Sequence, residues 1–540
     1  MRSSWWDKLN QPRAQQLALL LVPVLCGLLS LKLGQDDNWD LHNYHLYNPF
    51  ALLHGKIGLD LAPGQWQSYF NPTLDLLYYG LATSLPGPLT GFIKGWLHGL
   101  NFVLLLGLAR CLLPAGARRA QLLLALAGCL GPAFVSELGN SMGDNLTALT
   151  VLGALLLVLR QWPQLAEGCA RACWRIAAAG LLAGAGCGLK LTNAPYALAL
   201  CLALLALPMD WRARLKAALL FGFGVLGGIA LTAGHWYWRM WQVFGNPLFP
   251  QFNDRFHAPL AAPIGVGDTG WLPQGLAEKL LWPFIFTLHP RRVSELALRH
   301  LLWPLIYVAA IAALILLLQA ALRRRAAPLQ LAPGSRVLLV FFGLSYLIWL
   351  NLFSIYRYLV PLELLLPLAC WLLAQGLAGP LRGARLAGPV LACAALSVLS
   401  VGGWGHARWT RQAFDVSVPA LAAPERSMVV TLGADPPLGW LAVFFPPQTV
   451  FASLGAGFPE SDAYRARAAE LLAQRAAGLY LLLPDWRADL PDAAGERVQA
   501  TLVRYGLAAE LEGCRRYPAR VGRNRWDYKL CPLRRISPAN

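Results

Sequence analysis

The sequence predicts an α-helical polytopic membrane protein with about eleven transmembrane helices, followed by a small C-terminal α/β domain. Of its 540 residues, 56% are hydrophobic and 14% are charged, whereas soluble domains carry about 25% charged residues. Its mean hydropathy is +0.46. Apolar runs of about 20 residues, long enough to cross a bilayer as a helix, recur along most of the chain.

Eleven apolar runs are predicted to span the membrane, separated by short links rich in Arg or in Gly and Pro. Their ends are predicted to within a few residues. In chain order the predicted spans are residues 14–33, 91–113, 120–138, 144–160, 175–190, 193–209, 216–236, 301–322, 336–353, 357–378 and 386–403.

Every alternate link between these spans is basic, which predicts the orientation of the chain. Positively charged links remain on the cytoplasmic side, so the N-terminus is expected inside and the C-terminal domain in the periplasm. This pattern explains the net charge of +18 without a nucleic-acid partner. The basic links carry Arg110, Arg118 and Arg119; Arg160, Arg171 and Arg175; Arg212, Arg214 and Lys216; Arg323, Arg324 and Arg325; and Arg382 and Arg385.

The same orientation divides the chain into three parts. Residues 1–404 form the predicted transmembrane domain, with two long outer-face loops at 34–90 and 237–300. Residues 405–424 are predicted to form a linker, and residues 425–540 the soluble domain. In that last part strand-like runs alternate with helical patterns, as in small α/β domains.

Cysteine placement fits this division, because Cys514 and Cys531 are the two of eleven cysteines predicted to lie outside. Two cysteines in an oxidising compartment are a candidate disulfide, the alternative being two unpaired small residues. The sequence has no zinc spacing, P-loop, dinucleotide fingerprint or nucleophile elbow in a usable context. A soluble nucleotide-dependent mechanism therefore has no support.

The polar segment after the first span is the strongest candidate for chemistry. Asp36, Asp37 and Asp40 alternate there with aromatic side chains and are followed by Tyr44 and His45. Acids and aromatics at a span end can simply form an interfacial belt. Carboxylates packed among aromatic ring faces can also bind a sugar, and we favour this functional interpretation for Asp40.

Other charged residues are predicted on the same face. Asp144 lies at the start of the fourth span, where its alternative role is a helix cap. Lys190 lies at a span end, where a cation is either functional or snorkels to the interface. Outer-face cations run against the orientation bias and suggest an anionic ligand such as a phosphate. They are His289, Arg291, Arg292, Arg299, His300 and Arg357, the last followed by Tyr358.

An ordered set of short motifs resembles the GT-C superfamily of membrane glycosyltransferases, over about residues 1–405. The set consists of Asp40-Leu-His-Asn-Tyr44 with Ala51-Leu-Leu-His-Gly55, Asn71-Pro-Thr-Leu-Asp-Leu-Leu-Tyr78, Gly143-Asp144, Gly188-Leu-Lys190 and Arg357-Tyr-Leu-Val-Pro361. The chain has Asp-Leu where protein O-mannosyltransferases have Asp-Glu, which argues against that subfamily. The segment from Tyr237 to Pro250 looks like a signature of bacterial, largely uncharacterised members.

This resemblance implies a bacterial inner-membrane hexosyltransferase that moves a sugar from a polyprenyl-phosphate donor to an envelope glycan, lipid or protein acceptor. Inverting displacement needs a general base, for which Asp40 is expected, with Asp37 and Asp144 as further catalytic candidates. The expected substrate-binding residues are Tyr44, His45, Lys190, His289, Arg291, Arg292, Arg357 and Tyr358. No cofactor is required. The carboxylates could hold a divalent cation, although their spacing does not demand one.

Two other classes remain open from the sequence. A transporter or flippase would move a lipid-linked sugar or small anion without reacting it, but such proteins often show internal repeats, and none is evident here. An envelope assembly protein would use the C-terminal domain to bind a partner, and that domain carries no recognisable motif that decides the matter.

Overall fold

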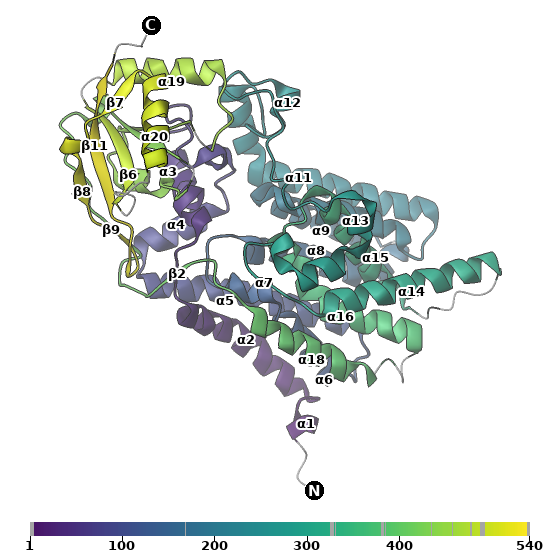
Figure 1. Ribbon diagram of the computed structural model, residues 1–540. Coiled ribbons are helices and arrows are strands. Elements are labelled where there is room, and N and C mark those ends of the chain that lie inside the picture. The colour runs from purple at the N-terminus through teal and green to yellow at the C-terminus, as the bar shows by residue number, and fades with distance from the viewer. Residues whose placement is uncertain are drawn as a thin grey trace.

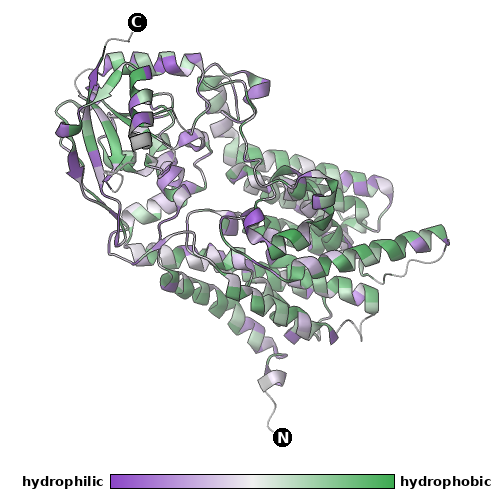
Figure 2. Cartoon of the chain, viewed as in Figure 1, coloured by the Kyte–Doolittle hydropathy of each residue, from purple (hydrophilic) through white to green (hydrophobic). Residues whose placement is uncertain are grey.

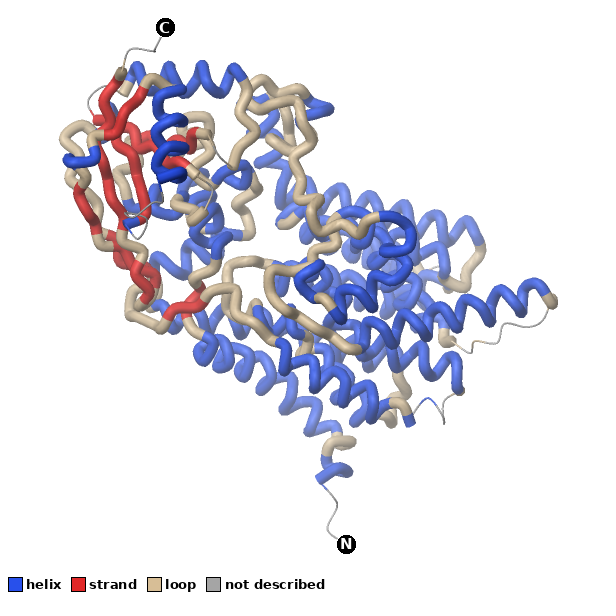
Figure 3. Tube along the Cα trace, viewed as in Figure 1, coloured by secondary structure: helices blue, strands red, loops and turns tan. Residues whose placement is uncertain are grey.

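The computed structural model describes residues 5–536 except 168, 325–328, 330, 380–382, 384, 434, 456, 476–477 and 486–491. Arg325 and Arg382 of the predicted basic links lie outside the described residues. The chain forms a helical bundle with a strand-rich C-terminal domain at one end (Figures 1 and 3). The predicted fold class, a polytopic helical membrane protein with a small C-terminal α/β domain, is confirmed.

Eight helical segments among the described residues are long and apolar enough to cross a membrane, and apolar residues dominate the bundle in Figure 2. Each corresponds to one predicted span. They are α2 (Pro12–Leu33), α5 (Gly87–Leu112), α8 (Asp144–Ala166), α9 (Ala170–Leu189), α11 (Trp211–Phe244), α14 (Leu302–Leu322), α15 (Pro333–Leu352) and the stretch Tyr356–Ala378, which joins η6 (Tyr356–Leu359) to α16 (Val360–Ala378).

The three other predicted spans are shorter helices in the same bundle. Span 120–138 is broken into α6 (Arg118–Gly128) and α7 (Pro132–Ser136). Span 193–209 is the run of η3 (Leu191–Asn193), α10 (Ala194–Ala203) and η4 (Leu204–Ala206), and span 386–403 is α18 (Ala387–Ser397) with η7 (Val398–Ser400). Pro132 lacks a backbone N–H, so it starts a new helix at α7 instead of continuing α6.

Two glycines let the neighbouring helices α9 and α11 touch along their backbones. A Cβ atom on Gly184 would lie 2.0 Å from the Val225 carbonyl oxygen, and one on Gly228 would lie 2.1 Å from the Leu181 oxygen. Membrane helices associate through such small-residue contacts because lipid tails offer no hydrophobic driving force between helices. This pair therefore fixes the end of α9, where Lys190 lies.

The long segments 34–90 and 245–300 lie at the end of the bundle that meets the C-terminal domain, called the domain side below (Figure 1). The first contains β1 (Gln35–Asp36), the π-helical turn η1 (Leu41–His45), α3 (Tyr47–Leu53), η2 (Gln65–Tyr69) and α4 (Asp75–Ser84). The second contains α12 (Asn253–Phe256), α13 (Gly275–Leu288) and η5 (Pro290–Arg292). A short helix α1 (Trp5–Lys8) precedes α2 at the opposite end.

The C-terminal domain is built on a six-stranded mixed sheet with the order β5-β4-β6-β11-β7, in which β8 also pairs with β11. Strand β4 is parallel to β5 and β6, whereas β11 is antiparallel to its neighbours. The strands are β4 (Ser427–Leu432), β5 (Val450–Leu454), β6 (Gly478–Pro484), β7 (Leu507–Ala509), β8 (Arg515–Tyr517) and β11 (Tyr528–Arg535), and the helices are α19 (Asp462–Gln474) and α20 (Asp492–Arg504). Short helical turns η8 (Pro424–Arg426), η9 (Gly439–Phe444) and η11 (Leu511–Gly513) complete it.

The stretch 405–424, predicted as a linker, contributes two short strands that join the two parts. Strand β2 (His406–Ala407) pairs with β1 of the first loop, and β3 (Phe414–Val416) pairs with β9 (Ala519–Val521) of the C-terminal domain. Strand β9 in turn pairs with β10 (Asn524–Arg525). The stretch thus ties the first loop to the C-terminal domain at the domain side.

The first loop is also bound directly to the C-terminal domain. The buried ammonium of Lys56 lies 3.0 Å from Asp60 Oδ1 and donates to the carbonyl oxygens of Pro447 and Thr449 at 3.0 and 2.5 Å. Asp60 accepts from the Phe451 backbone N–H at 3.0 Å. A buried charge is tolerated because it is paired and hydrogen-bonded.

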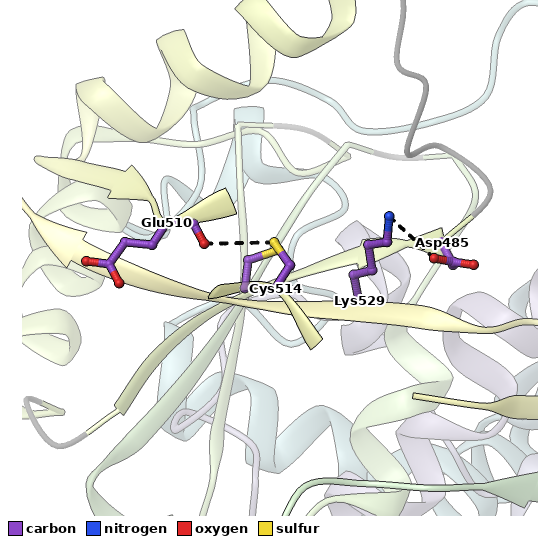
Figure 4. Close-up of a disulfide and its surroundings, with 5 residues drawn as sticks. Asp485, Glu510, Cys514 and Lys529 are labelled. Carbon is purple, nitrogen blue, oxygen red and sulfur yellow. Dashed lines mark hydrogen bonds and ion pairs between the residues drawn. A yellow bond between two sulfur atoms is a disulfide. The ribbon is translucent and has the colours of Figure 1, made fainter. Parts of the chain in front are cut away.

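The predicted disulfide between Cys514 and Cys531 is confirmed (Figure 4). It links the end of η11 to the central strand β11. The other nine cysteines are free. The bridge therefore braces the edge of the sheet that carries β8 and β7.

Candidate active site

A cavity of about 610 Å³ opens at the domain side, between the ends of the helices and the two long loops. Its wall is formed by parts of both long loops and by the ends of membrane helices. These parts are segment 40–45, η2, the end of α9, the end of α11, residues 247–252 and 266–269, and η6. Most of the wall is apolar or aromatic, with a few charged groups. A concave, largely apolar site with a few placed polar groups is typical of ligand pockets.

Asp40 and Arg357 face each other in this cavity as an ion pair. Arg357 Nη1 lies 2.6 Å from Asp40 Oδ2. Burial alone would raise the pKa of Asp40, but the charge and hydrogen bond of Arg357, with the charges of His45 and Lys190, hold the pKa below its usual value. Asp40 is therefore ionised in the ligand-free protein.

Lys190 and Asp144 form a second ion pair beside the first, with Nζ 2.6 Å from Asp144 Oδ2. Lys190 also donates to the carbonyl oxygen of Met142 at 2.8 Å. Asp144 is the first residue of α8, and the N-cap position before it is occupied by Gly143 at φ 86°. The alternative prediction of a helix cap thus gives way to an ion pair, because Lys190 ends α9 directly opposite.

The ring of Tyr358 lies against both cations. The Lys190 ammonium is 5.4 Å from the ring centroid and the Arg357 guanidinium is 5.3 Å from it. Cation–π contacts of this length are attractive. Tyr358 thereby holds two positive charges on one wall of the cavity, while Arg357 also lies 5.9 Å from the ring of Trp404.

Tyr44 and His45 come from the π-helical turn η1 and line the same cavity. His45 Nδ1 lies 2.7 Å from Asp75 Oδ1, and the rings of His45 and Tyr44 are 4.2 Å apart. Burial raises the pKa of Tyr44 well above its usual value, and the Asp40 carboxylate raises it further. The Tyr44 hydroxyl is therefore neutral and can donate a hydrogen bond.

Asp37 lies outside the cavity lining and binds the C-terminal domain. Its Oδ1 lies 2.7 Å from His42 Nε2 and accepts from Trp526 Nε1 at 3.0 Å, and its Oδ2 accepts from Asn524 Nδ2 at 2.6 Å. Neighbouring Asp36 accepts from the Ser141 backbone N–H at 2.7 Å. Both carboxylates are thus used to hold segments of the protein together.

The cations at 289–292 do not line the cavity either. Arg292 pairs with Glu278 at 2.7 Å and lies 5.2 Å from the ring of Trp282. His289 and Arg291 are exposed at the turn after α13. Their position in the long loop suggested a phosphate site, but they are not among the residues that line the cavity with Arg357.

Several cavity residues were not predicted individually. Asp75 and Asn71 belong to the motif Asn71–Tyr78, and Tyr237, Pro247 and Phe249 to the segment 237–250, so the resemblance marked their segments without assigning them roles. Their signal in the sequence is a polar or proline-bearing motif directly at a span end. Glu295 and Asp268 also line the cavity and carried no such signal.

Among the residues that the structure describes, no group of three or more His, Cys, Asp or Glu side chains could hold a metal ion. The acids considered as metal ligands were Asp36, Asp37, Asp40 and Asp144. Two of them already have a cationic partner, Arg357 for Asp40 and Lys190 for Asp144. A divalent cation bound by either carboxylate would compete with that partner.

No family model and no curated protein matches the sequence. Solved structures align with it at low identity. ArnT from Cupriavidus metallidurans bound to undecaprenyl phosphate aligns at 12% identity and a TM-score of 0.48, over 97% of this chain and 98% of that one. The Archaeoglobus fulgidus oligosaccharyltransferase in complex with Zn and sulfate aligns at 15% and 0.44, over 85% and 67%.

A second Archaeoglobus fulgidus structure, the oligosaccharyltransferase AglB in complex with an inhibitory peptide and a dolichol-phosphate, aligns at 13% identity and a TM-score of 0.44. That alignment covers 89% of this chain and 70% of that one. At these identities and TM-scores the likeness assigns no reaction or ligand to this chain.

Proposed function

We propose that this protein is a membrane glycosyltransferase of the GT-C type, which transfers a sugar from a polyprenyl-phosphate donor to an acceptor of the bacterial cell envelope. One observation carries the proposal. A carboxylate, Asp40, and two cations, Lys190 and Arg357, meet in one cavity at the ends of membrane helices, with the Tyr358 ring against both cations.

The cations suit the phosphate of the donor. Two positive charges fixed in a largely apolar wall stabilise an anion more strongly than they would in water. When the sugar leaves the phosphate, negative charge develops on the phosphate oxygen that is released. Lys190 and Arg357 would neutralise it without a proton donor, since a phosphate monoester is already a good leaving group.

Asp40 suits the role of general base. The acceptor hydroxyl oxygen forms a bond to the anomeric carbon, the bond from that carbon to the phosphate oxygen breaks, and the hydroxyl proton passes to the Asp40 carboxylate. This route inverts the anomeric configuration. Asp144 would keep Lys190 in place, and Tyr44 and His45 would offer ring faces and hydrogen bonds to the sugar.

Donor binding would also prepare the base. In the ligand-free protein Arg357 lowers the pKa of Asp40, which makes the carboxylate a weak base. A phosphate that draws on the charge of Arg357 removes part of that effect, so the buried Asp40 becomes more basic when the donor is present. The Asp40–Arg357 pair thus links phosphate binding to proton transfer.

We place the domain side in the periplasm and the N-terminus in the cytoplasm of a bacterial inner membrane. The up-and-down helices put the basic links at the end of the bundle opposite to the cavity, as the orientation bias requires. Reporter fusions after Arg325 and after Asn540 should read cytoplasmic and periplasmic respectively. The same compartment at both points would contradict this topology.

The deciding experiment is transfer by the purified full chain in liposomes. Radiolabelled polyprenyl-phosphate sugars are supplied with fractionated envelope glycans, lipids and proteins, and label in the acceptor is measured with and without EDTA. Asp40→Asn should lower transfer by about 100-fold or more, whereas Asp462→Asn, which removes an exposed carboxylate of α19, should leave it unchanged. Movement of intact labelled donor across the bilayer without product would instead make the protein a flippase.

A further inference from the structure

Four exposed arginines lie together where the C-terminal domain meets the ends of two membrane helices. Arg408 and Arg411 follow β2, and Arg520 and Arg523 belong to the hairpin of β9 and β10. The two segments are joined, since the Arg523 N–H donates to the Arg408 oxygen at 3.0 Å and the Gly522 N–H to the Ala413 oxygen at 2.9 Å. We call this surface the arginine face.

The arginine face is anchored at the level where two spans end. The Trp409 indole N–H donates to the carbonyl oxygen of Leu31, in the last turn of α2, at 2.7 Å. The N–H of Gly87, the first residue of α5, donates to the Arg411 oxygen at 2.9 Å. The Trp409 ring lies on α5 so closely that a Cβ on Gly91 would be 2.2 Å from it.

These anchors place residues 408–411 at the boundary of the membrane. An amphipathic tryptophan at the end of a span is typical of the headgroup level. In Figure 1 the β9 end of the domain lies next to the α5 end of the bundle, whereas α19 and α20 lie farther from it. The arginine face is therefore the part of the domain nearest to lipid headgroups.

The charges of this face are not balanced by the protein. Arg520 stands directly across from Arg525 in the β9–β10 ladder, and like charges in such a pair are destabilising. Arg525 is compensated by Asp527 at 2.5 Å. Among the residues that the structure describes, no carboxylate forms an ion pair with any arginine of this face, that is with Arg408, Arg411, Arg520 or Arg523. Asp415 lies across from Arg520 in the β3–β9 ladder without forming one.

We propose that the arginine face binds the phosphate groups of anionic phospholipids in the leaflet on the domain side. Guanidinium groups match phosphate oxygens in charge and geometry. The face lies on the side of the bundle opposite to the basic links, so orientation of the chain does not account for it. Its unpaired arginines and its position at the span ends fit a headgroup layer. The inference is independent of the proposed transfer reaction.

The hairpin that carries two of these arginines also holds the segment before Asp40. Asn524, next to Arg523, donates to Asp37 at 2.6 Å. A headgroup bound at the face would therefore steady the contact between the C-terminal domain and the first loop. This gives the domain a place on the membrane surface beside the cavity.

The test is to titrate the detergent-purified full chain separately with dioctanoyl-phosphatidylglycerol, dioctanoyl-phosphatidylcholine and inorganic phosphate. Binding is measured by isothermal calorimetry. The phosphatidylglycerol should bind at least tenfold more tightly than the phosphatidylcholine, and less tightly as salt is added. Each of the single substitutions should weaken phosphatidylglycerol binding by about fivefold. They are R408Q, R411Q, R520Q and R523Q. The matched control is R465Q with R504Q, at exposed arginines on α19 and α20.

Each outcome decides the question. Unchanged phosphatidylglycerol binding in the variant that combines all four substitutions overturns the proposal, as does equal loss in the control pair. Inorganic phosphate that binds as tightly as the lipid would make the face a site for free anions instead. Should the combined variant fail to fold, the four single variants, each at an exposed side chain, carry the same test, and R523K should retain binding.

Discussion

The carboxylate of Asp40 accepts a hydrogen bond of 2.6 Å from the guanidinium of Arg357, across 317 positions of sequence. Asp40 precedes the π-helical turn after the first span, and Arg357 is the second residue of η6, which leads into α16. Each charge would be costly to bury alone at the end of a membrane helix, and the partner offsets that cost. The pair joins the first loop to the last long span at the cavity.

Replacing the proposed base tests this pair first. Asp40→Asn keeps the shape of the side chain and removes its basicity, so turnover should fall by about 100- to 10,000-fold. Donor binding should remain, because the cations stay in place. The measurement is kcat in the liposome assay beside donor binding by calorimetry. Turnover that Asp40→Asn leaves unchanged would refute the assignment.

Removing the cavity cations should separate donor binding from folding. Lys190→Ala and Arg357→Ala should each raise the donor KM by about 10- to 150-fold, since a hydrogen bond to a charged group contributes about 1.5–3 kcal/mol. Arg291→Ala and Arg292→Ala are the matched controls, because these exposed arginines do not line the cavity. Equal effects in the two pairs would place the phosphate elsewhere.

Replacing Asp37 should loosen the C-terminal domain instead of removing a base. Its carboxylate binds His42, Asn524 and Trp526, and Asp37→Asn cannot accept from all of them. We expect about 1–3 kcal/mol of lost stability for a buried donor left unpaired. Limited proteolysis and thermal unfolding measure this. A normal melting profile with complete loss of transfer would make Asp37 catalytic.

The Asp40–Arg357 pair also predicts a pH dependence of stability in the ligand-free protein. The pKa of Asp40 is lowered in the folded chain, so its contribution is fully present above the ordinary carboxyl pKa of about 3.9. It is lost as the pH falls through the lowered value. The difference in Tm between the protein and Asp40→Asn should therefore stay constant from about pH 5 to 8 and shrink in more acidic buffers. A constant difference throughout would contradict the pair.

The disulfide should be detectable in intact cells. Cys514 and Cys531 should resist a thiol reagent until reduction, whereas exposed Cys111 should react in permeabilised cells without it. Replacing both by Ser should cost about 3 kcal/mol of stability, from the chain entropy of the loop that the bridge closes. Full labelling of either cysteine before reduction would show that the bridge does not form in cells.

The positions and lengths of the long membrane spans could be predicted from the sequence alone. The long helices α2, α5 and α14 follow from apolar runs because their backbone hydrogen bonds are all local. The predicted span 120–138 shows the limit of this reasoning. Its apolar content is right for a span, but Pro132 breaks the helix and a Cβ on Gly131 would lie 2.3 Å from a Glu363 carboxyl oxygen, a contact that no local pattern reveals.

The first-loop acids show a second limit. Asp37 and Asp40 are three residues apart in one polar, aromatic segment, and their local patterns are alike. The partners that separate them, Asn524 and Arg357, come from remote parts of the chain. The same holds for the cations. Arg292 pairs with Glu278, whereas Arg357 lines the cavity, and the sequence around each does not show this difference.

The sequence by itself determined the membrane class and the positions of the long spans, predicted a separate C-terminal domain, and made the two outer cysteines a candidate disulfide. These depend on composition, hydrophobic run length and residue counts, which are local quantities. The tertiary structure alone decided which charged residues meet in the cavity and which bind the two parts together. A charge acquires its role from the partner across the fold, and electrostatic pairing over a few ångströms leaves no trace in sequence spacing.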